Sequence, residues 1–129
     1  MATSLEDVLK AVAEKTRLRI LNLLRMRSVC VCDLQSILAL PQPVVSRHLS
    51  ILRRAGLVDD TRVGSRVIYS RADSNLPTAD AIWSLIEKAA VKDEVLQSDL
   101  RALEAAVRRG ECAGSRDSNL GEEIPTCAS

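Results

Sequence analysis

Residues 42–58 read QPVVSRHLSILRRAGLV, and this stretch decides the fold. Proline is tolerated in the first turn of a helix, so Pro43 predicts a helix that begins near Gln42 and runs to Ala55. Gly56 then favours a stop, because glycine readily adopts the left-handed conformation in which many helices end. The apolar residues of the segment recur at spacings of four and three, as one buried face of a helix requires: Val45, Leu49 and Leu52.

Beyond Gly56 the hydrophobic period changes from helical to alternating. The segments LVDDTR and SRVIYSR flank Val63-Gly64, a pattern that is typical of a β-hairpin. Arg62 and Arg66 lie on either side of its expected tip, where they can reach phosphate or a minor groove. The longer helix is therefore followed by an arginine-bearing hairpin.

Upstream, the pattern predicts a short helix from Leu34 to Ala39, with Asp33 as its N-cap and 29–32 as a short extended link. A short helix, a tight turn, a longer helix and a hairpin follow one another in the order of a winged helix-turn-helix. Further helices are expected over 5–14, with Ser4 as the N-cap, over 17–27 after Thr16, and from Pro77 onward, with a break or a kink at Lys92-Asp93.

Length and composition fit one mainly α-helical domain with a small β-hairpin. The chain has 129 residues, of which 47% are hydrophobic and only 2% aromatic, so leucine, valine, isoleucine and alanine must build the core. We expect a winged helix-turn-helix and dimerisation domain over 1–109. Residues 110–129 are rich in glycine, serine and charge and are expected to form a flexible tail that contains cysteine.

Charge is distributed unevenly although the net charge is only +1. Residues 41–71 carry six arginines against two aspartates, whereas residues 93–129 carry eight acidic residues against four arginines. This asymmetry indicates that the middle of the chain meets an anion while the C-terminal part stays away from it. The N-terminus is acidic and lacks an apolar run, so we expect neither a signal peptide nor a membrane segment, and a cytoplasmic protein with reduced thiols.

The outward positions of residues 42–55, together with the hairpin arginines, form a candidate DNA-binding surface. Arginine pairs with guanine or phosphate, glutamine with adenine, and valine with a thymine methyl group. The alternative is a solvated helix with an ordinary surface hairpin, in which a single histidine is a satisfied surface or core residue. The predicted DNA-binding residues are Gln42, Pro43, Val44, Ser46, Arg47, His48, Ser50, Arg54, Arg62 and Arg66.

Residues 13–71 resemble the ArsR/SmtB family of bacterial metal-responsive repressors, and in particular its arsenic-responsive branch. The matching segments are AEKTRLRILNLL (13–24), VCVCDLQ (29–35), QPVVSRHLSILRRAGLV (42–58) and GSRVIYSR (64–71). The resemblance implies a homodimeric winged-helix repressor that leaves its operator DNA when metal binds. Ser46, Arg47 and His48 would then lie on the recognition helix.

Cys30 and Cys32 stand two residues apart, directly before the first helix of the helix-turn-helix. In an extended chain both side chains point to one side, with Cα atoms roughly 6.5–7 Å apart. In a helix they diverge by about 200°, which is unsuitable for sharing one ion. We therefore predict a switch in which two thiolates closing on a soft ion pull the segment out of helical form. The alternative is that both cysteines are small buried hydrophobes.

The predicted effector is trivalent arsenic or antimony, with no organic cofactor. Arsenic-responsive relatives often carry a third cysteine where this chain has Gln35, so the third ligand is open: Cys112, Cys127, a small thiol or water. A disulfide between residues two apart would be strained, so we do not expect a framework of bridges. A cadmium/lead-responsive or thiol-redox-responsive repressor of the same fold is the alternative.

Two other chemistries are disfavoured by the single histidine of the chain. Some relatives bind zinc through Asp and His on their C-terminal dimer helices, whereas here the only histidine is His48, in the DNA-reading helix. A thiol enzyme needs an activating base near a cysteine, and no catalytic arrangement is visible. We therefore predict a regulator and not an enzyme.

Apolar stripes in the first and last helices predict a symmetric homodimer built from 5–12 and 82–107. Ile82 and Trp83 are candidate packing centres of the dimer, and the alternative is that they belong to the ordinary core of one chain. Two-fold symmetry would place the two recognition helices about 34–36 Å apart, one turn of DNA.

Overall fold

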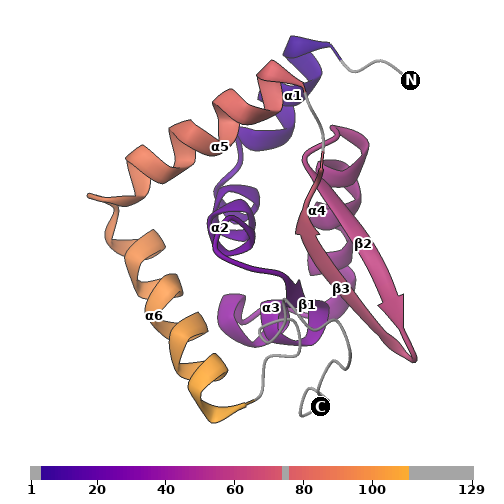
Figure 1. Cartoon of the computed structure of the whole chain (residues 1–129), viewed down its shortest axis with the longest axis vertical. Helices are drawn as coiled ribbons and strands as arrows, with labels where there is room; N and C mark the ends of the chain where they lie inside the picture. Colours follow the sequence, from indigo (N-terminus) through magenta and orange to yellow (C-terminus); the bar gives the residue numbers. More distant parts are fainter. Residues whose placement is uncertain (1–3, 74–75, 111–129) are drawn as a thin grey trace.

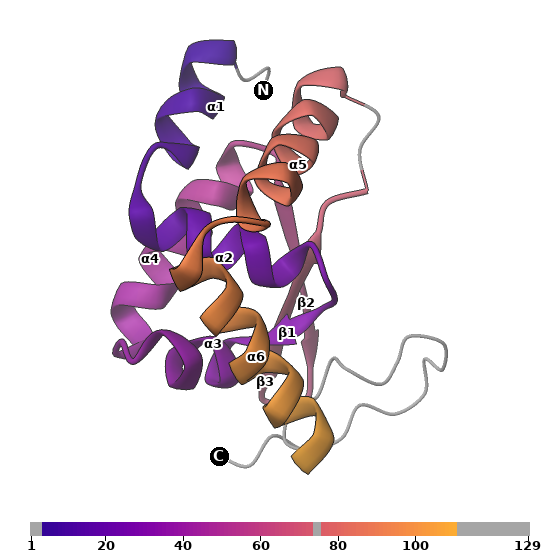
Figure 2. The ribbon, with the colours of Figure 1, turned by 90° about the vertical axis from the view of Figure 1, so that its left-hand side faces the viewer.

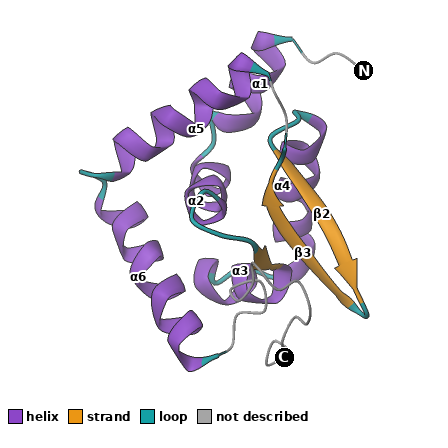
Figure 3. Ribbon diagram, viewed as in Figure 1, coloured by secondary structure: helices purple, strands orange, loops and turns teal. Residues whose placement is uncertain are grey.

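The computed structural model describes residues 4–73 and 76–110. These residues form helices and one small antiparallel sheet, with the sheet at one side of the molecule and helices over the rest (Figures 1 and 3). In chain order the elements are α1 (Leu5–Val12), α2 (Lys15–Leu24), β1 (Val29–Cys30), α3 (Val31–Leu38), α4 (Gln42–Arg54), β2 (Val58–Val63), β3 (Arg66–Arg71), α5 (Pro77–Ala90) and α6 (Glu94–Arg109).

Helix α4 follows the prediction closely. It begins at Gln42, ends at Arg54, and has Ala55 as its C-cap, after which Gly56 takes a φ of +82°. A positive φ is costly for residues with a Cβ atom, so glycine at this position turns the chain into β2. The predicted stripe is fully buried in the core that the helices share: Val45, Leu49 and Leu52.

The β2–β3 hairpin is confirmed, and it carries a third strand that the sequence did not reveal. Its register runs from Val58 opposite Arg71 to Val63 opposite Arg66, with the turn at Gly64-Ser65. Strand β1 pairs with the other edge of β3, with Cys30 opposite Ile68, so the sheet order is β1-β3-β2. The two residues of β1 are too few to show a strand period.

Helix α3 begins earlier than predicted. The expected N-cap, Asp33, lies inside its first turn, and Cys30 is the N-cap, with extended backbone angles of φ −81° and ψ 156°. The extended conformation belongs to strand β1, and the chain turns into the helix immediately after it. The predicted four-residue link is therefore a short strand followed directly by helix.

Helices α1 and α2 meet at a capped junction. Ser4 caps α1 as predicted, because its Oγ accepts a hydrogen bond from the amide of Asp7 at 3.1 Å. Glu14, and not Thr16, caps α2 by accepting from the amide of Arg17 at 2.8 Å. The side chain of Glu14 is long enough to reach the free amides in the first turn of α2, so it caps the helix in place of the hydroxyl of Thr16 that we expected.

Helices α5 and α6 are separate and enclose α2. The chain breaks at residues 91–93, as predicted, and Asp93 caps α6 by accepting from the amide of Leu96 at 3.0 Å. Figures 1 and 2 show α5 and α6 diverging from this corner, with α2 inside the angle between them. Leu21 and Leu23 of α2 are fully buried there.

Ile82 and Trp83 are buried within the single chain, which corrects their assignment as packing centres of a dimer. Both belong to the shared core, and Trp83 also lies 5.0 Å from the guanidinium of Arg71. The spacing of apolar residues in α5 predicted an apolar face, but it could not show that α2 of the same chain covers that face. Among the described helices, none combines the length and the apolar character that crossing a bilayer requires.

A partly buried ion pair joins α2 to α6. Arg19 donates from Nε and Nη2 to the two carboxylate oxygens of Asp99, at 2.8 and 2.9 Å. The side chain of Asp99 is only 6% exposed and that of Arg19 is 23% exposed. The hydrogen bond to Asp99 raises the pKa of Arg19, burial opposes this rise, and the charge of Asp99 adds to it, so Arg19 stays protonated.

We expect Arg19→Ala to lower the free energy of unfolding by about 3 kcal/mol, because it leaves the buried carboxylate of Asp99 without its partner. Urea denaturation at neutral pH measures the change. The matched control is Lys10→Ala, which breaks the exposed Lys10–Glu6 pair (74% and 75% exposed). That variant should cost less than about 0.5 kcal/mol, and equal losses in the two variants would contradict the account.

Candidate functional site

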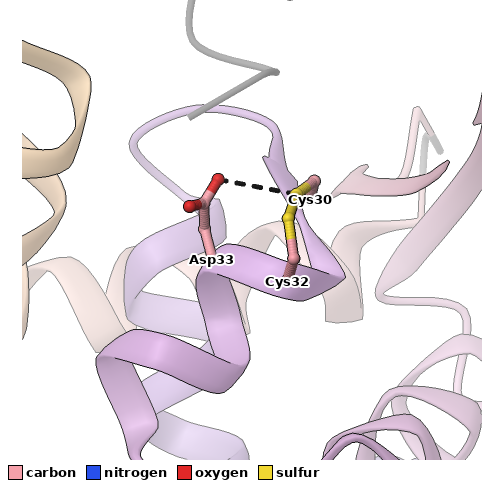
Figure 4. A group of neighbouring side chains, drawn as sticks. All are labelled: Cys30, Cys32 and Asp33. Atoms are coloured by element: carbon pink, nitrogen blue, oxygen red, sulfur yellow. Dashed lines mark hydrogen bonds between the residues drawn. A yellow bond between two sulfur atoms is a disulfide. The ribbon is translucent and has the colours of Figure 1, made fainter. Parts of the chain in front are cut away.

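The sulfurs of Cys30 and Cys32 meet at the junction between β1 and α3 (Figure 4). Their Cα atoms are 5.4 Å apart and a disulfide joins the side chains. The expectation that this pair forms no bridge is therefore wrong. Cys30 is extended whereas Cys32 is already helical, and this change of backbone conformation brings the two side chains to the same side.

The predicted conflict between a shared ligand and a regular helix does not exist here. We expected the sulfurs to converge only if the segment left its helical form. In the structure they converge while α3 is intact from Val31, because the N-cap position places Cys30 outside the helical spiral. Unwinding of α3 is therefore not needed for both sulfurs to reach one ion.

Asp33 belongs to the same group of side chains. One ligand atom each from Cys30, Cys32 and Asp33 lie within 4.8 Å of one another, and Oδ2 of Asp33 is 3.5 Å from Sγ of Cys30. The dashed line in Figure 4 marks this contact between Cys30 and Asp33. The sequence pattern predicted Asp33 as a helix cap, although an acidic residue directly after a cysteine pair also indicates a possible ligand.

The pair has one buried and one accessible member. Cys30 is buried against Ile68 of strand β3, and the half-buried Cys32 packs on the same small cluster. Cys32 lies at the surface of the cluster, so a small reagent can reach the pair from its side. Burial of Cys30 next to β3 fits the alternative of a core cysteine equally well, and the facing carboxylate of Asp33 is what distinguishes this site from an apolar core.

The cysteine pair opens onto a groove of about 640 Å³. One wall is α3, with Cys32 and Gln35; the others are the start of α4 and the hairpin. Four of the predicted DNA-binding residues line this same groove: Gln42, Ser46, Arg62 and Arg66. The structure thus brings the predicted ligand residues and part of the predicted DNA-binding surface to one place.

The remaining predicted DNA-binding residues lie along α4 outside the groove. Pro43, Arg47, Ser50 and Arg54 are exposed, whereas Val44 is half-buried. At the start of the helix the amide Nε2 of Gln42 donates to Oγ of Ser46 at 2.8 Å. Contact of these side chains with DNA stays a prediction.

His48 faces the interior junction of α1 and α2. Its Nδ1 is 3.0 Å from Nη1 of Arg17 and 3.9 Å from Oε1 of Glu14, and its side chain is 17% exposed. Arg17 can only donate, so Nδ1 of His48 is the acceptor of this hydrogen bond. Because Arg17 also donates to the carbonyl of Ala11, His48 ties α4 to this junction. Its predicted contact with DNA stays untested beside this internal role.

An ion pair links α4 to the hairpin. Arg53 of α4 donates from Nε to Oδ1 of Asp60 in β2 at 3.1 Å. Nearby, burial raises the pKa of Tyr69, the charge of Asp60 adds to the rise, and Arg53 opposes it. The phenol of Tyr69, which lines the groove, therefore keeps its proton at neutral pH.

Cys112 and Cys127, predicted as further ligands, lie outside the described residues. Whether either tail cysteine acts as the third ligand therefore stays a prediction. Within 4–73 and 76–110, Cys30, Cys32 and Asp33 are the group of three potential metal ligands that the structure brings together.

A helix-turn-helix formed by α3 and α4 and followed by the β2–β3 wing defines a winged helix-turn-helix transcriptional regulator. The model of the ArsR family of bacterial regulatory proteins matches residues 14–60. The arsenical resistance operon repressor of Escherichia coli K12 is 36% identical over 112 residues, which cover 84% of this chain and 88% of the repressor. The chain therefore belongs to the ArsR family, as its motifs predicted, and is not an enzyme.

Two further comparisons agree with this assignment. The transcriptional repressor SmtB of Mycobacterium tuberculosis is 43% identical over 70 residues, which cover 54% of this chain. The chain spans about half the length (52%) of that relative. A homodimeric winged helix-turn-helix DNA-binding domain from Mycobacterium bovis, a possible ArsR-family regulator, superposes with a TM-score of 0.57 at 28% identity, covering 67% of this chain and 78% of that one.

We expect mild oxidation of the purified chain with diamide to join Cys30 to Cys32 within one molecule. The tryptic peptide between Arg27 and Arg47 contains both cysteines and no other, so it should lose two hydrogens and resist alkylation until it is reduced. Mass spectrometry of this peptide measures the bond. Disulfides exclusively to Cys112, Cys127 or a second chain would contradict the geometry, and Cys32→Ser is the control that cannot form the bond.

Proposed function

We propose that this chain is a transcriptional repressor that binds operator DNA as a homodimer and is released when arsenite or antimonite binds Cys30 and Cys32. The observation that supports this most strongly is the position of the two sulfurs, which share a groove with the start of α4 and with the wing. The name of the Escherichia coli relative, an arsenical resistance operon repressor, favours a metalloid effector. No organic cofactor is invoked.

The chemistry of the pair suits a thiophilic metalloid. Sulfur ligands select soft ions, and a helix N-terminus favours the anionic thiolate, which is the ligating form. One arsenious acid condenses with the two thiols, forms two arsenic–sulfur bonds, releases two water molecules and keeps one hydroxyl group. No electrons are transferred, so the reaction requires only that Cys30 and Cys32 are reduced.

The sheet and the groove supply a path from the cysteines to DNA. Cys30 pairs through β1 with Ile68 of β3, and β3 begins with Arg66 of the wing. A ligand held by Cys32 also occupies the wall that faces Gln42 and Ser46. Binding there therefore acts on the spacing between α4 and the wing. By linkage, the effector lowers DNA affinity by the same factor by which DNA lowers effector affinity.

A homodimer is supported by apolar side chains that the single chain leaves exposed. Leu5 and Leu9 of α1, Leu85 of α5 and Val95 of α6 are each at least 40% exposed. Isolated exposed leucines are common, but these lie on the terminal helices that we expected to dimerise. The Mycobacterium bovis relative is a homodimer. The proposed dimer places its two α4 helices on half-sites about one DNA turn apart.

The disulfide favours a second candidate function, a thiol-redox-responsive repressor of the same fold. Peroxide would take two electrons from the thiols of Cys30 and Cys32, form the sulfur–sulfur bond and be reduced to two water molecules. α3 is intact with the bond in place, so under the metalloid proposal the oxidised chain should still bind operator DNA, whereas the redox candidate requires that oxidation releases it. Release from the operator by peroxide in the absence of metalloid would favour this alternative.

We expect the double variant Cys30→Ser, Cys32→Ser to bind operator DNA with wild-type affinity and to ignore arsenite. Serine keeps the size of each side chain but removes the soft donor atom. Fluorescence anisotropy of labelled operator DNA, titrated with arsenite, measures the effect. The control is Cys112→Ser, Cys127→Ser, which tests the tail cysteines as ligands. Normal release of the first double variant by arsenite would show that the sensor lies elsewhere.

We expect Arg62→Ala to weaken operator binding and to reduce the slope of log affinity against log salt concentration by about one, as the loss of one phosphate contact does. Arg62 is exposed in the wing, so its removal should leave the fold unchanged. Arg101→Ala, on the exposed face of α6, is the matched control and should leave the slope unchanged. A slope that is the same in both variants would place the wing away from DNA.

A further inference from the structure

The groove beside the cysteine pair is large enough for a small molecule and carries two arginines of the wing. Its volume is about 640 Å³, within the range of pockets that hold drug-sized ligands, and Arg62 and Arg66 line it together with Cys32. We propose that this groove binds a small thiol that carries carboxylates, such as a cysteine-containing peptide, whose sulfur becomes the third ligand of the bound arsenic. The proposal deepens the function proposed above and rests on arsenite binding to Cys30 and Cys32.

Arsenic bound to Cys30 and Cys32 keeps one hydroxyl group, and a thiol can take the place of this group. The S–H of the small thiol reacts with the As–OH group: an arsenic–sulfur bond forms, the arsenic–oxygen bond breaks, and one water molecule leaves. Arsenic stays trivalent, so the step needs no oxidant or reductant. A third sulfur suits this soft ion better than a hydroxyl group does. Gln35, which lines the groove three residues after Cys32, has no sulfur to offer.

The accessible side of the cysteine pair faces the groove. Cys30 is 1% exposed and packs against Ile68, and the carboxylate of Asp33 lies beside its sulfur (Figure 4). Cys32 is half-buried and forms part of the groove wall together with Gln35. Because protein atoms fill the space around Cys30, we expect a third group on the arsenic to extend past Cys32 into the groove.

The charge of the groove suits the carboxylates of such a thiol. Arg62 and Arg66 come from adjacent positions of the hairpin, since Arg62 pairs with Val67, the residue after Arg66. Asp60 also lines the groove, but Arg53 binds its carboxylate at 3.1 Å and balances its negative charge. Guanidinium groups bind carboxylates through two parallel hydrogen bonds. A thiol without carboxylates would lack this contribution to binding.

Binding of the thiol would also help to release DNA while α3 stays intact. Its carboxylates would occupy Arg62 and Arg66, the wing arginines that are predicted to contact phosphate or a minor groove. Gln42 and Ser46 at the start of α4 line the same groove. The thiol and the operator would then compete for the same guanidinium groups. This competition adds a direct effect to the path that runs through the sheet.

The test uses the full reduced chain with arsenite and one of two probe thiols, glutathione or its diethyl ester, which has the same thiol but no free carboxylate. Native mass spectrometry measures the fraction of chains that hold both arsenic and the added thiol. Glutathione should give about 10-fold more of this adduct than the ester, as two exposed arginine–carboxylate contacts predict. Arg62→Gln should lower the glutathione adduct about 3-fold and leave the ester adduct unchanged. Arg101→Gln, on the exposed face of α6, is the matched control.

The comparison of the two probe thiols needs only the wild-type chain. Equal amounts of adduct with glutathione and with the ester overturn the proposal, and so does an unchanged glutathione adduct in Arg62→Gln. An arsenic adduct that holds no added thiol and has lost three hydrogens would show that Cys112 or Cys127 supplies the third sulfur, which also overturns it. An arsenic adduct that persists in Cys30→Ser, Cys32→Ser would instead overturn the proposed function.

Discussion

Cys30 is both the last residue of strand β1 and the N-cap of helix α3, and the sensor region depends on this double position. Its extended backbone pairs with Ile68 of β3, which fixes Cys30 to the sheet of the wing. The helix that starts at the next residue brings Cys32 to the same side and places Asp33 3.5 Å from the first sulfur. A helix that began three residues later would remove Cys32 and Asp33 from this arrangement.

The rest of the fold holds the DNA-reading helix against the same sheet. Fully buried residues attach α4 to the core, and the Arg53–Asp60 pair joins its end to strand β2. His48 and Arg17 join its middle to the junction of α1 and α2. The cysteine pair, helix α4 and the β2–β3 wing therefore pack together around one groove. A structural change at the sulfurs would directly affect residues of the proposed DNA-binding surface.

The sequence predicted the helices and strands that are long enough for their apolar residues to repeat at a regular spacing. Val45, Leu49 and Leu52 identified α4, and the alternation around Gly64 identified the hairpin, since both patterns are long enough to show their periods. The two-residue strand β1 is too short to show a period, and without this strand the early start of α3 could not be predicted.

The convergence of Cys30 and Cys32 followed from a change of backbone conformation between them, which neither a regular strand nor a regular helix describes. Asp33 was predicted as a cap because the helix was expected to begin at Leu34, whereas it begins at Val31.

The burial of Ile82 and Trp83 depends on the position of α2. The apolar stripe of one helix does not show which neighbouring helix covers it.

The most direct test of the account is hydrogen–deuterium exchange of the reduced chain with and without arsenite. The account predicts that exchange changes in 29–35 and extends to the hairpin over 58–71, because β1 and β3 are paired. It predicts no comparable change in Arg19 and its neighbours at the α2–α6 contact. A change confined to 29–35, in protein that nevertheless leaves its operator, would contradict transmission through the sheet.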